Sequence, residues 1–226
     1  MKKADQLRLR YATILNILIC VMGIIGLILC VKRDGSLHLD YYTQQSNMLA
    51  IVASALVAYF TWRKMQRPKT EIPYWVVMLK YMSIVSLTIT LLVVLFILIP
   101  IFAGEMGFWT SFATFLFSSS MTYTHTLCPI VSIISFLYFE RHIFKGWKAV
   151  WIALIHTILY AILAITLNIA KVWEGPYPFL MVYKNPVWQT IAYSVVILGG
   201  AVAISRGYEV INRRIADSKK PKTVKK

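Results

Sequence analysis

The sequence predicts an all-α membrane protein, a polytopic bundle of six transmembrane helices. Hydrophobic residues make up 58% of the 226 residues and charged residues only 15%. The apolar residues come in blocks of about twenty, the length that a helix needs to cross a bilayer. The connections between the blocks are short, so they leave no room for a soluble domain or a closed barrel.

The six spans follow one another without a repeat or a Gly-, Ser- or Pro-rich linker. A window scan places them, in order, at residues 12–31, 43–62, 75–103, 112–139, 149–170 and 187–205. The first block has no small-residue cleavage site, so we expect a retained helix and not a signal peptide. The predicted organisation is a six-helix transmembrane domain at 1–206 and a basic cytoplasmic C-terminal tail at 207–226.

The positive charge is concentrated on one side of the predicted bundle. Of the 24 Lys and Arg residues, all but Lys32, Arg33, Lys171 and Lys184 fall in the two tails, in the second and fourth connections, or near the same end in the third span. The positive-inside rule therefore predicts that both termini are cytoplasmic. We expect the basic tail to contact anionic lipid headgroups, and we expect no binding to nucleic acid.

Several classes of chemistry lack their usual signatures in this chain. The spacing of Cys20, Cys30 and Cys128 suggests neither a metal site nor a disulfide framework, and we interpret the three as small buried apolar residues. The sequence contains no Gly-rich phosphate loop and no HExxH, GxSxG or CxxC motif. We therefore expect no metal and no cofactor.

Polar residues cluster where the second span begins. Residues 41–50 read Tyr-Tyr-Thr-Gln-Gln-Ser-Asn-Met-Leu-Ala, and polar groups in hydrocarbon are costly. With both termini inside, this helix starts at the outer face, and Thr43 lies in its first turn. Helical spacing places Ser46 and Asn47 on the same face as Thr43.

The fourth span carries a second polar cluster around His125, its only readily ionised side chain. Pro129, four residues on, deprives the His125 carbonyl of its helical hydrogen bond. An imidazole can take the proton from a Thr hydroxyl, so Thr43 and His125 form a candidate nucleophile–base pair. The alternative is structural, because such residues also cap and bridge helices.

Three other features of the sequence have simpler interpretations. We expect Lys80 to extend its amine to the cytoplasmic interface and His156 to be structural. The proline- and aromatic-rich residues 172–180 could form a lid over an outer pocket or an interfacial loop on lipid.

Three short stretches together resemble a known family. They are the YT-QQ-SN-L stretch at Thr43, the His-Thr-Leu-Cys-Pro stretch at His125, and Pro-Tyr-Pro at 176–178. In this order they are similar to the androgen-induced-gene family of six-helix intramembrane threonine hydrolases and its bacterial relatives. The resemblance implies cleavage of fatty acid esters of hydroxy fatty acids in a bacterial plasma membrane, with Thr43 as nucleophile and His125 as base.

These observations favour a membrane hydrolase of an amphiphilic lipid acyl ester. We expect Ser46, Asn47, Tyr123 and Tyr177 to contact the substrate, with Asn47 donating to the developing oxyanion. The alternatives are a non-catalytic lipid or small-molecule binding protein, a transporter, or an acyltransferase with the same pair of residues. The oligomeric state stays open at this point.

Overall fold

The first half of the chain forms three long helices. The computed structural model describes residues 3–140 and 146–217. The first three spans are α1 (Lys3–Asp34), α2 (Tyr42–Gln66) and α3 (Tyr74–Val93), the last of which continues through the π-helix η1 (Val94–Leu98) into α4 (Ile99–Met106).

The second half supplies three more spans and an outer loop. Its elements are α5 (Phe108–Phe117), α6 (Ser119–Met121), the π-helix η2 (Thr122–Leu127), α7 (Cys128–Ile134), the π-helix η3 (Ser135–Phe139), α8 (Gly146–Ile169), the 3-10 helix η4 (Pro178–Leu180) and α9 (Val187–Asp217). Six helices are long and apolar enough to cross a membrane, and the described residues include no strand. The predicted fold class is therefore confirmed.

The expected helix at 112–139 is not continuous. The chain breaks after α5 because Ser118 is extended (φ −95°, ψ 125°) and Ser119 has a φ of 40°. Serine hydroxyls bond to nearby backbone groups and so compete with helical hydrogen bonds. The Ser118 hydroxyl does so here, donating to the Thr114 carbonyl at 2.5 Å.

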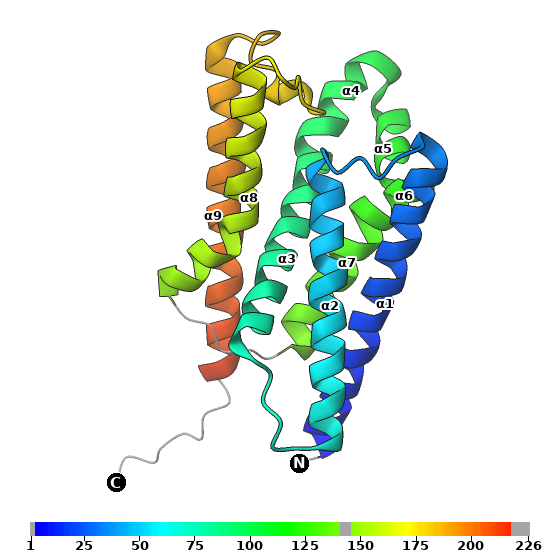
Figure 1. Cartoon of the computed structure of the whole chain (residues 1–226), viewed down its shortest axis with the longest axis vertical. Coiled ribbons are helices and arrows are strands. Elements are labelled where there is room, and N and C mark those ends of the chain that lie inside the picture. The colour runs from blue at the N-terminus through cyan, green and yellow to red at the C-terminus, as the bar shows by residue number, and fades with distance from the viewer. Residues whose placement is uncertain (1–2, 141–145, 218–226) are drawn as a thin grey trace.

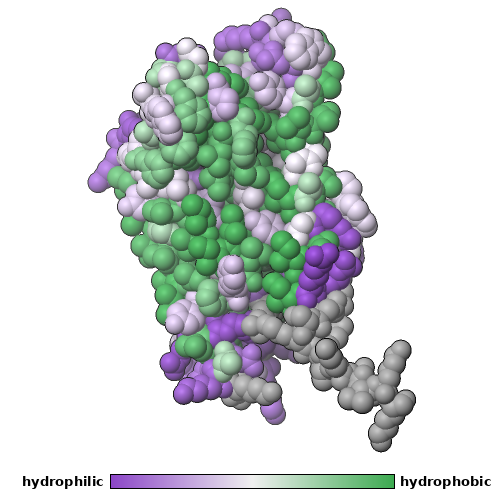
Figure 2. All heavy atoms as spheres, turned by 180° about the vertical axis from the view of Figure 1, so that it is seen from behind, coloured by the Kyte–Doolittle hydropathy of each residue, from purple (hydrophilic) through white to green (hydrophobic). Residues whose placement is uncertain are grey.

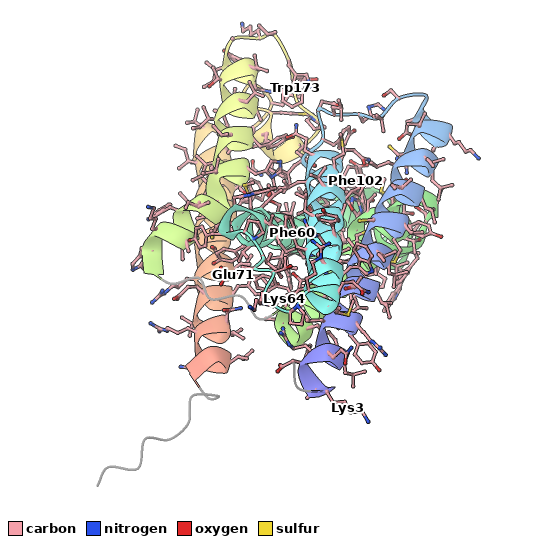
Figure 3. All side chains as sticks on the ribbon, turned by 60° about the horizontal axis from the view of Figure 1, so that its bottom comes forward. Lys3, Phe60, Lys64, Glu71, Phe102 and Trp173 are labelled. Atoms are coloured by element: carbon pink, nitrogen blue, oxygen red, sulfur yellow. The ribbon has the colours of Figure 1, made fainter. Side chains whose placement is uncertain are left out.

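The helices run along one another and their ends gather at two poles (Figure 1). The beginning of α1 and the end of α9 lie at one pole, and the α1–α2, α4–α5 and α8–α9 connections lie at the other. Figure 3 shows Lys3 toward the first pole and Trp173 at the second. We call the second pole the outer end, following the charge-based prediction, and the first pole the inner end.

The last helix is longer than predicted. It runs to Asp217, so residues 207–217 of the predicted tail continue α9, and the rest of that tail, 218–226, lies outside the described residues.

The surface between the poles is largely apolar. Hydrophobic residues cover the middle of the visible face, and hydrophilic residues gather toward the ends (Figure 2). Large apolar side chains such as Ile14, Phe96 and Leu159 are at least half exposed. An exposed apolar belt of this kind is what a bilayer covers.

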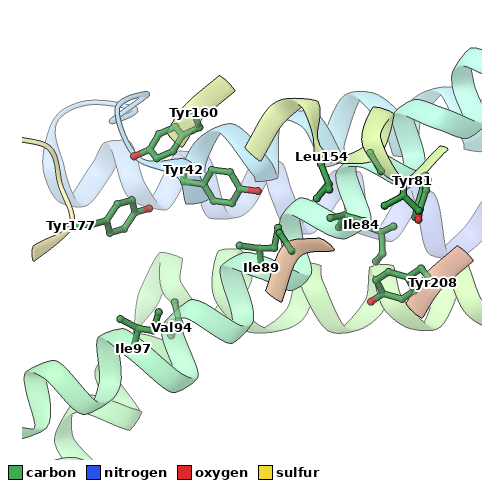
Figure 4. Close-up of a cluster of buried hydrophobic side chains, with 14 of the residues drawn as sticks. Tyr42, Tyr81, Ile84, Ile89, Val94, Ile97, Leu154, Tyr160, Tyr177 and Tyr208 are labelled. Atoms are coloured by element: carbon green, nitrogen blue, oxygen red, sulfur yellow. The ribbon is translucent and has the colours of Figure 1, made fainter. Parts of the chain in front are cut away.

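The core contains a cluster of buried aromatic and aliphatic side chains that joins α3, α8 and α9 (Figure 4). Tyr81 and Tyr208 lie at one end of the close-up, and Tyr42, Tyr160 and Tyr177 lie at the other. On the opposite side of α3, α1 approaches η2 closely at Gly26. A Cβ there would lie 2.9 Å from the Thr124 methyl carbon, so only glycine fits without a shift.

Lys80 does not reach the interface, and that expectation is wrong. Its side chain is fully buried, donates to the Ser54 hydroxyl at 2.9 Å, and lies 3.7 Å from Glu140 Oε1. The same carboxylate oxygen accepts hydrogen bonds from Asn16 at 2.7 Å and Ser135 at 2.6 Å. Charges inside a membrane bundle pair with one another when a partner lies within reach, and Glu140 provides that partner.

Candidate functional site

The break between α5 and α6 explains the position of His125. The last carbonyls of a helix have no helical partner, so other groups must satisfy them. His125 Nδ1 lies 2.8 Å from the Phe115 carbonyl oxygen, and the Thr126 hydroxyl donates to the Leu116 carbonyl at 2.8 Å. Two neighbouring side chains of η2 thus cap the end of α5.

This contact also defines the state of the imidazole. A carbonyl oxygen can only accept a hydrogen bond, so Nδ1 carries the proton and Nε2 of the neutral ring has a free lone pair. Among the described residues, Nε2 has no hydrogen-bond partner. The π-helical turn that holds His125 ends before Pro129, where the Cys128 N–H bonds to the Tyr123 carbonyl. The His125 ring is therefore held by its Nδ1, and its Nε2 can accept a proton.

Thr43 lies in the first turn of α2, as predicted, and is 6% exposed. Its backbone N–H donates to the Tyr177 hydroxyl at 3.4 Å. Its carbonyl accepts hydrogen bonds from Ser46 at 3.0 Å and from Asn47 at 2.8 Å. The shared face predicted for Thr43, Ser46 and Asn47 is thus observed.

Thr43 and His125 line the same cavity at the outer end of the bundle. The cavity has a volume of about 390 Å³, and Phe115 and Tyr177 also line it. Arg33, Asp34, His38 and Gln44 form a polar part of its wall. No hydrogen bond joins Thr43 to His125 within the described part of the chain. The two side chains therefore share a space that a ligand could enter.

A second, apolar cavity meets the first one at Thr43. Its volume is about 70 Å³, and Thr43, Leu98 and Tyr177 line both cavities. The remainder of its wall is mostly aliphatic and aromatic, with residues from α3, η1, α8, η4 and α9 that include Ile89, Val94, Ile165, Phe179 and Leu198. We call it the apolar slot. Thr43 lies at the boundary between a polar space and an apolar one.

Tyr177 belongs to the outer loop between α8 and α9. Tyr177, Phe179 and Leu180 are each less than a tenth exposed, so the middle of the loop packs into the bundle instead of lying on lipid. The Glu174–Lys184 ion pair, at 2.7 Å, links the two sides of the loop. Burial raises the pKa of Tyr177 to about 12, so its hydroxyl keeps its proton near neutral pH.

The structure separates the other three residues expected to contact substrate from both cavities. Ser46 is fully buried and lies 3.0 Å from the Thr90 hydroxyl. Asn47 gives its amide hydrogens to the carbonyls of Thr43 and Thr124, the latter at 3.1 Å. Tyr123 packs in a small cluster with Ile19 and Met22 of α1. This geometry supports a bridging role for Ser46 and Asn47 and a packing role for Tyr123, and it does not place Asn47 at a developing oxyanion.

Sequence reasoning did not identify the Phe115 carbonyl as the group that orients His125. It also did not place Leu98 or the polar residues Arg33 and His38 at the cavity. Backbone carbonyls carry no sequence signal. The Ser118–Ser120 run before η2 was the available sign that α5 would end early and leave carbonyls to be capped.

A second histidine makes the direct hydroxyl contact that His125 lacks. His156 Nδ1 lies 3.0 Å from the Ser86 hydroxyl, and the ring stacks on Tyr42 at 4.9 Å. Ser86 is fully buried, and neither residue lines the outer cavity or the apolar slot. A ligand held in either of these spaces would therefore not contact this pair.

Fold and site together define a multi-pass helical membrane protein with a Thr- and His-lined cavity at one end. Comparisons with protein-family models, with curated proteins and with solved structures find no match. The resemblance to the androgen-induced-gene family stays a prediction.

Proposed function

We propose that the protein is an intramembrane hydrolase that cleaves an amphiphilic lipid acyl ester, with Thr43 as nucleophile and His125 as base. The observation that carries the proposal is the shared cavity of Thr43 and His125, with Nδ1 fixed by the Phe115 carbonyl and Nε2 free. The junction of a polar and an apolar space at Thr43 suits a substrate with one polar and one apolar part.

In each half of the proposed reaction, His125 accepts one proton and then returns it. Thr43 Oγ1 attacks the ester carbonyl carbon, and its proton passes to His125 Nε2. The ester C–O bond then breaks, and the departing alcohol oxygen takes that proton. A water molecule then attacks the carbonyl carbon of the acyl-threonine and gives a proton to His125 Nε2. The C–Oγ1 bond breaks, and Thr43 Oγ1 takes that proton from Nε2. The products are a fatty acid and an alcohol.

Tyr177 is the proposed donor to the oxyanion. Its hydroxyl lies next to Thr43, lines both cavities, and keeps its proton because burial raises the pKa of Tyr177 to about 12. Asn47 is a poorer donor because its amide hydrogens are already bonded to carbonyls. An oxyanion-hole donor typically contributes about 3 kcal/mol to transition-state stabilisation.

The second candidate function is lipid binding without turnover. The observation that favours it is the capping of the Phe115 carbonyl by His125, which gives this histidine a structural role of its own. In that case the cavities would hold an amphiphile that Thr43 never attacks. An acyltransferase would use the same acyl-threonine and a different acceptor.

Covalent labelling of the purified protein by a fluorophosphonate distinguishes these functions. The hydrolase predicts labelling that disappears in Thr43→Ala and falls by about 100-fold or more in His125→Gln, the lower end of a general-base contribution. Ser86→Ala is the matched control, because it removes a buried hydroxyl that lines neither cavity. Labelling that survives in Thr43→Ala, or that fails in the wild type, would contradict the proposal.

A further inference from the structure

The side of the bundle carries an apolar groove between α3–η1 and α9. Its volume is about 310 Å³, and its wall includes Ile89, Phe96, Val196 and Gly200. Phe96 is 72% exposed and Val196 is 64% exposed, so the rim of the groove lies on the apolar surface of the bundle. Hydrocarbon surrounds this face in a membrane, and the groove can therefore take an apolar occupant directly from the bilayer.

The groove lies next to the apolar slot behind Thr43. Ile89, Val93 and Ile197 line both spaces. The π-helix η1 forms the wall between them, since Val94 and Leu98 face the slot while Phe96 and Ile97 face the groove. Short π-helical segments inside helices occur frequently at functional sites.

The path from the groove through the apolar slot to the outer cavity changes polarity at Thr43. From the lipid-facing rim to Leu98 the walls are mostly apolar, and beyond Thr43 the outer cavity is lined by Arg33, Asp34 and His38. A molecule that fits the whole path has a hydrocarbon chain at one end and a polar group at the other. A two-chain lipid would leave one chain outside, because the described residues form a single apolar slot at Thr43.

We infer that the groove and the slot form one binding site for a single long, unbranched acyl chain, which enters sideways from the membrane between α3 and α9. The chain's carboxyl end then lies at Thr43 and the polar alcohol of the ester lies in the outer cavity. Only the placement of the ester at Thr43 rests on the proposed function. Binding of the chain requires no turnover.

Two neighbouring glycines of α9 provide a matched test of this site. Gly200 lines the groove, and a Cβ built on it would meet no atom of another element within 4 Å. Gly199 has the same open space, is exposed, and does not line the groove. Gly200→Phe therefore fills the groove and Gly199→Phe does not. Both variants remove a glycine from a helix interior, so helix propensity gives no reason for either to unfold.

Photo-crosslinking with palmitic acid that carries a diazirine near its methyl end tests chain binding without turnover. In lipid nanodiscs, the wild type and Thr43→Ala should be labelled on the peptides of α3–η1 and α9. Labelling should fall about tenfold in Gly200→Phe, as expected when two or so methylene groups lose their burial, and stay unchanged in Gly199→Phe. Equal labelling in the two glycine variants, or none in the wild type, would overturn the inference.

Hydrolysis of p-nitrophenyl palmitate and p-nitrophenyl butyrate separates this inference from the proposed function. Gly200→Phe should lower kcat/KM for the palmitate about tenfold and leave the butyrate unchanged, because only the long chain reaches the groove. An equal effect on both esters would contradict the chain site. If the wild type hydrolyses neither ester while the crosslinking pattern holds, the hydrolase proposal fails and the chain site stands.

Discussion

The outer and inner halves of the bundle both contain buried polar residues, but they use them differently. In the outer half, Thr43 and His125 line a cavity, and Nε2 of His125 has no hydrogen-bond partner among residues 3–140 and 146–217. In the inner half, Lys80 bonds with Ser54 and pairs with Glu140, whose Oε1 also accepts from Asn16. Polar groups that satisfy one another hold helices together, whereas polar groups arranged around a space can receive a ligand.

The two histidines of the spans show the same difference. His156 is hydrogen-bonded to Ser86 and would look like the better dyad from that distance alone. It lines neither the outer cavity nor the apolar slot, so an ester bound in those spaces would not contact it. His125 lacks a direct hydrogen bond to a hydroxyl but lines the outer cavity. Access to a ligand is therefore the property that distinguishes the candidate site.

The largest expected effect is on stability and belongs to the inner half. Lys80→Met should lower the free energy of unfolding by about 3 to 5 kcal/mol, because it leaves Glu140 buried without its charge partner. Thermal unfolding in detergent measures this loss. The double variant Lys80→Met/Glu140→Gln should recover much of it, since a neutral amide still accepts from Asn16 and Ser135. If the double variant is as unstable as Lys80→Met, the pair stabilises the fold by something other than the neutralisation of the Glu140 charge.

The next effect is on rate and compares the two histidines directly. His125→Gln should lower ester turnover by about 100-fold or more, because glutamine can bond to the Phe115 carbonyl but cannot accept and return a proton. His156→Gln should keep near-normal turnover, since His156 faces neither cavity. Hydrolysis of a p-nitrophenyl ester by the two purified variants gives the comparison. An equal loss of turnover in His125→Gln and His156→Gln, or a loss in neither, would contradict the distinction between the two histidines.

The pH profile of the wild type gives this comparison an internal check. A base must be unprotonated, so turnover should rise with pH as His125 loses its proton. Tyr177 should not reverse this rise near neutral pH, because burial raises the pKa of its hydroxyl to about 12 and the donor keeps its proton.

Much of this architecture could be predicted from the sequence because it depends on composition. Apolar blocks fix the number of helices, and a polar cluster at the start of a block marked Thr43. His125 was found because an ionisable residue is rare in a membrane span. For the loop that carries Tyr177 the sequence left two interpretations open, a lid over an outer pocket and an interfacial loop on lipid, and the burial of Tyr177 at the outer cavity favours the first.

The remainder depends on contacts between distant residues. Glu140 lies just beyond its span, and its pairing with Lys80 follows from helix packing and not from a local pattern. The end of α5 depends on the conformation of Ser118 and Ser119, and one such break decides which carbonyl orients His125. Asn47 shared a face with Thr43 as predicted, but its hydrogen bond to the Thr124 carbonyl on η2 could not be predicted from the spacing.

The smallest expected effect tests whether a hydroxyl beside Thr43 is enough for function. Ser46 lies one turn from Thr43, bonds to the Thr43 carbonyl and to Thr90, and lines neither cavity. Ser46→Ala should therefore cost about 0.6 kcal/mol of stability, the average for a hydrogen bond between membrane helices, and leave turnover unchanged. Thermal unfolding and ester hydrolysis on the same sample measure both. If Ser46→Ala instead abolishes turnover while the fold holds, a fully buried hydroxyl takes part in the reaction, and the distinction between bridging groups and cavity groups fails.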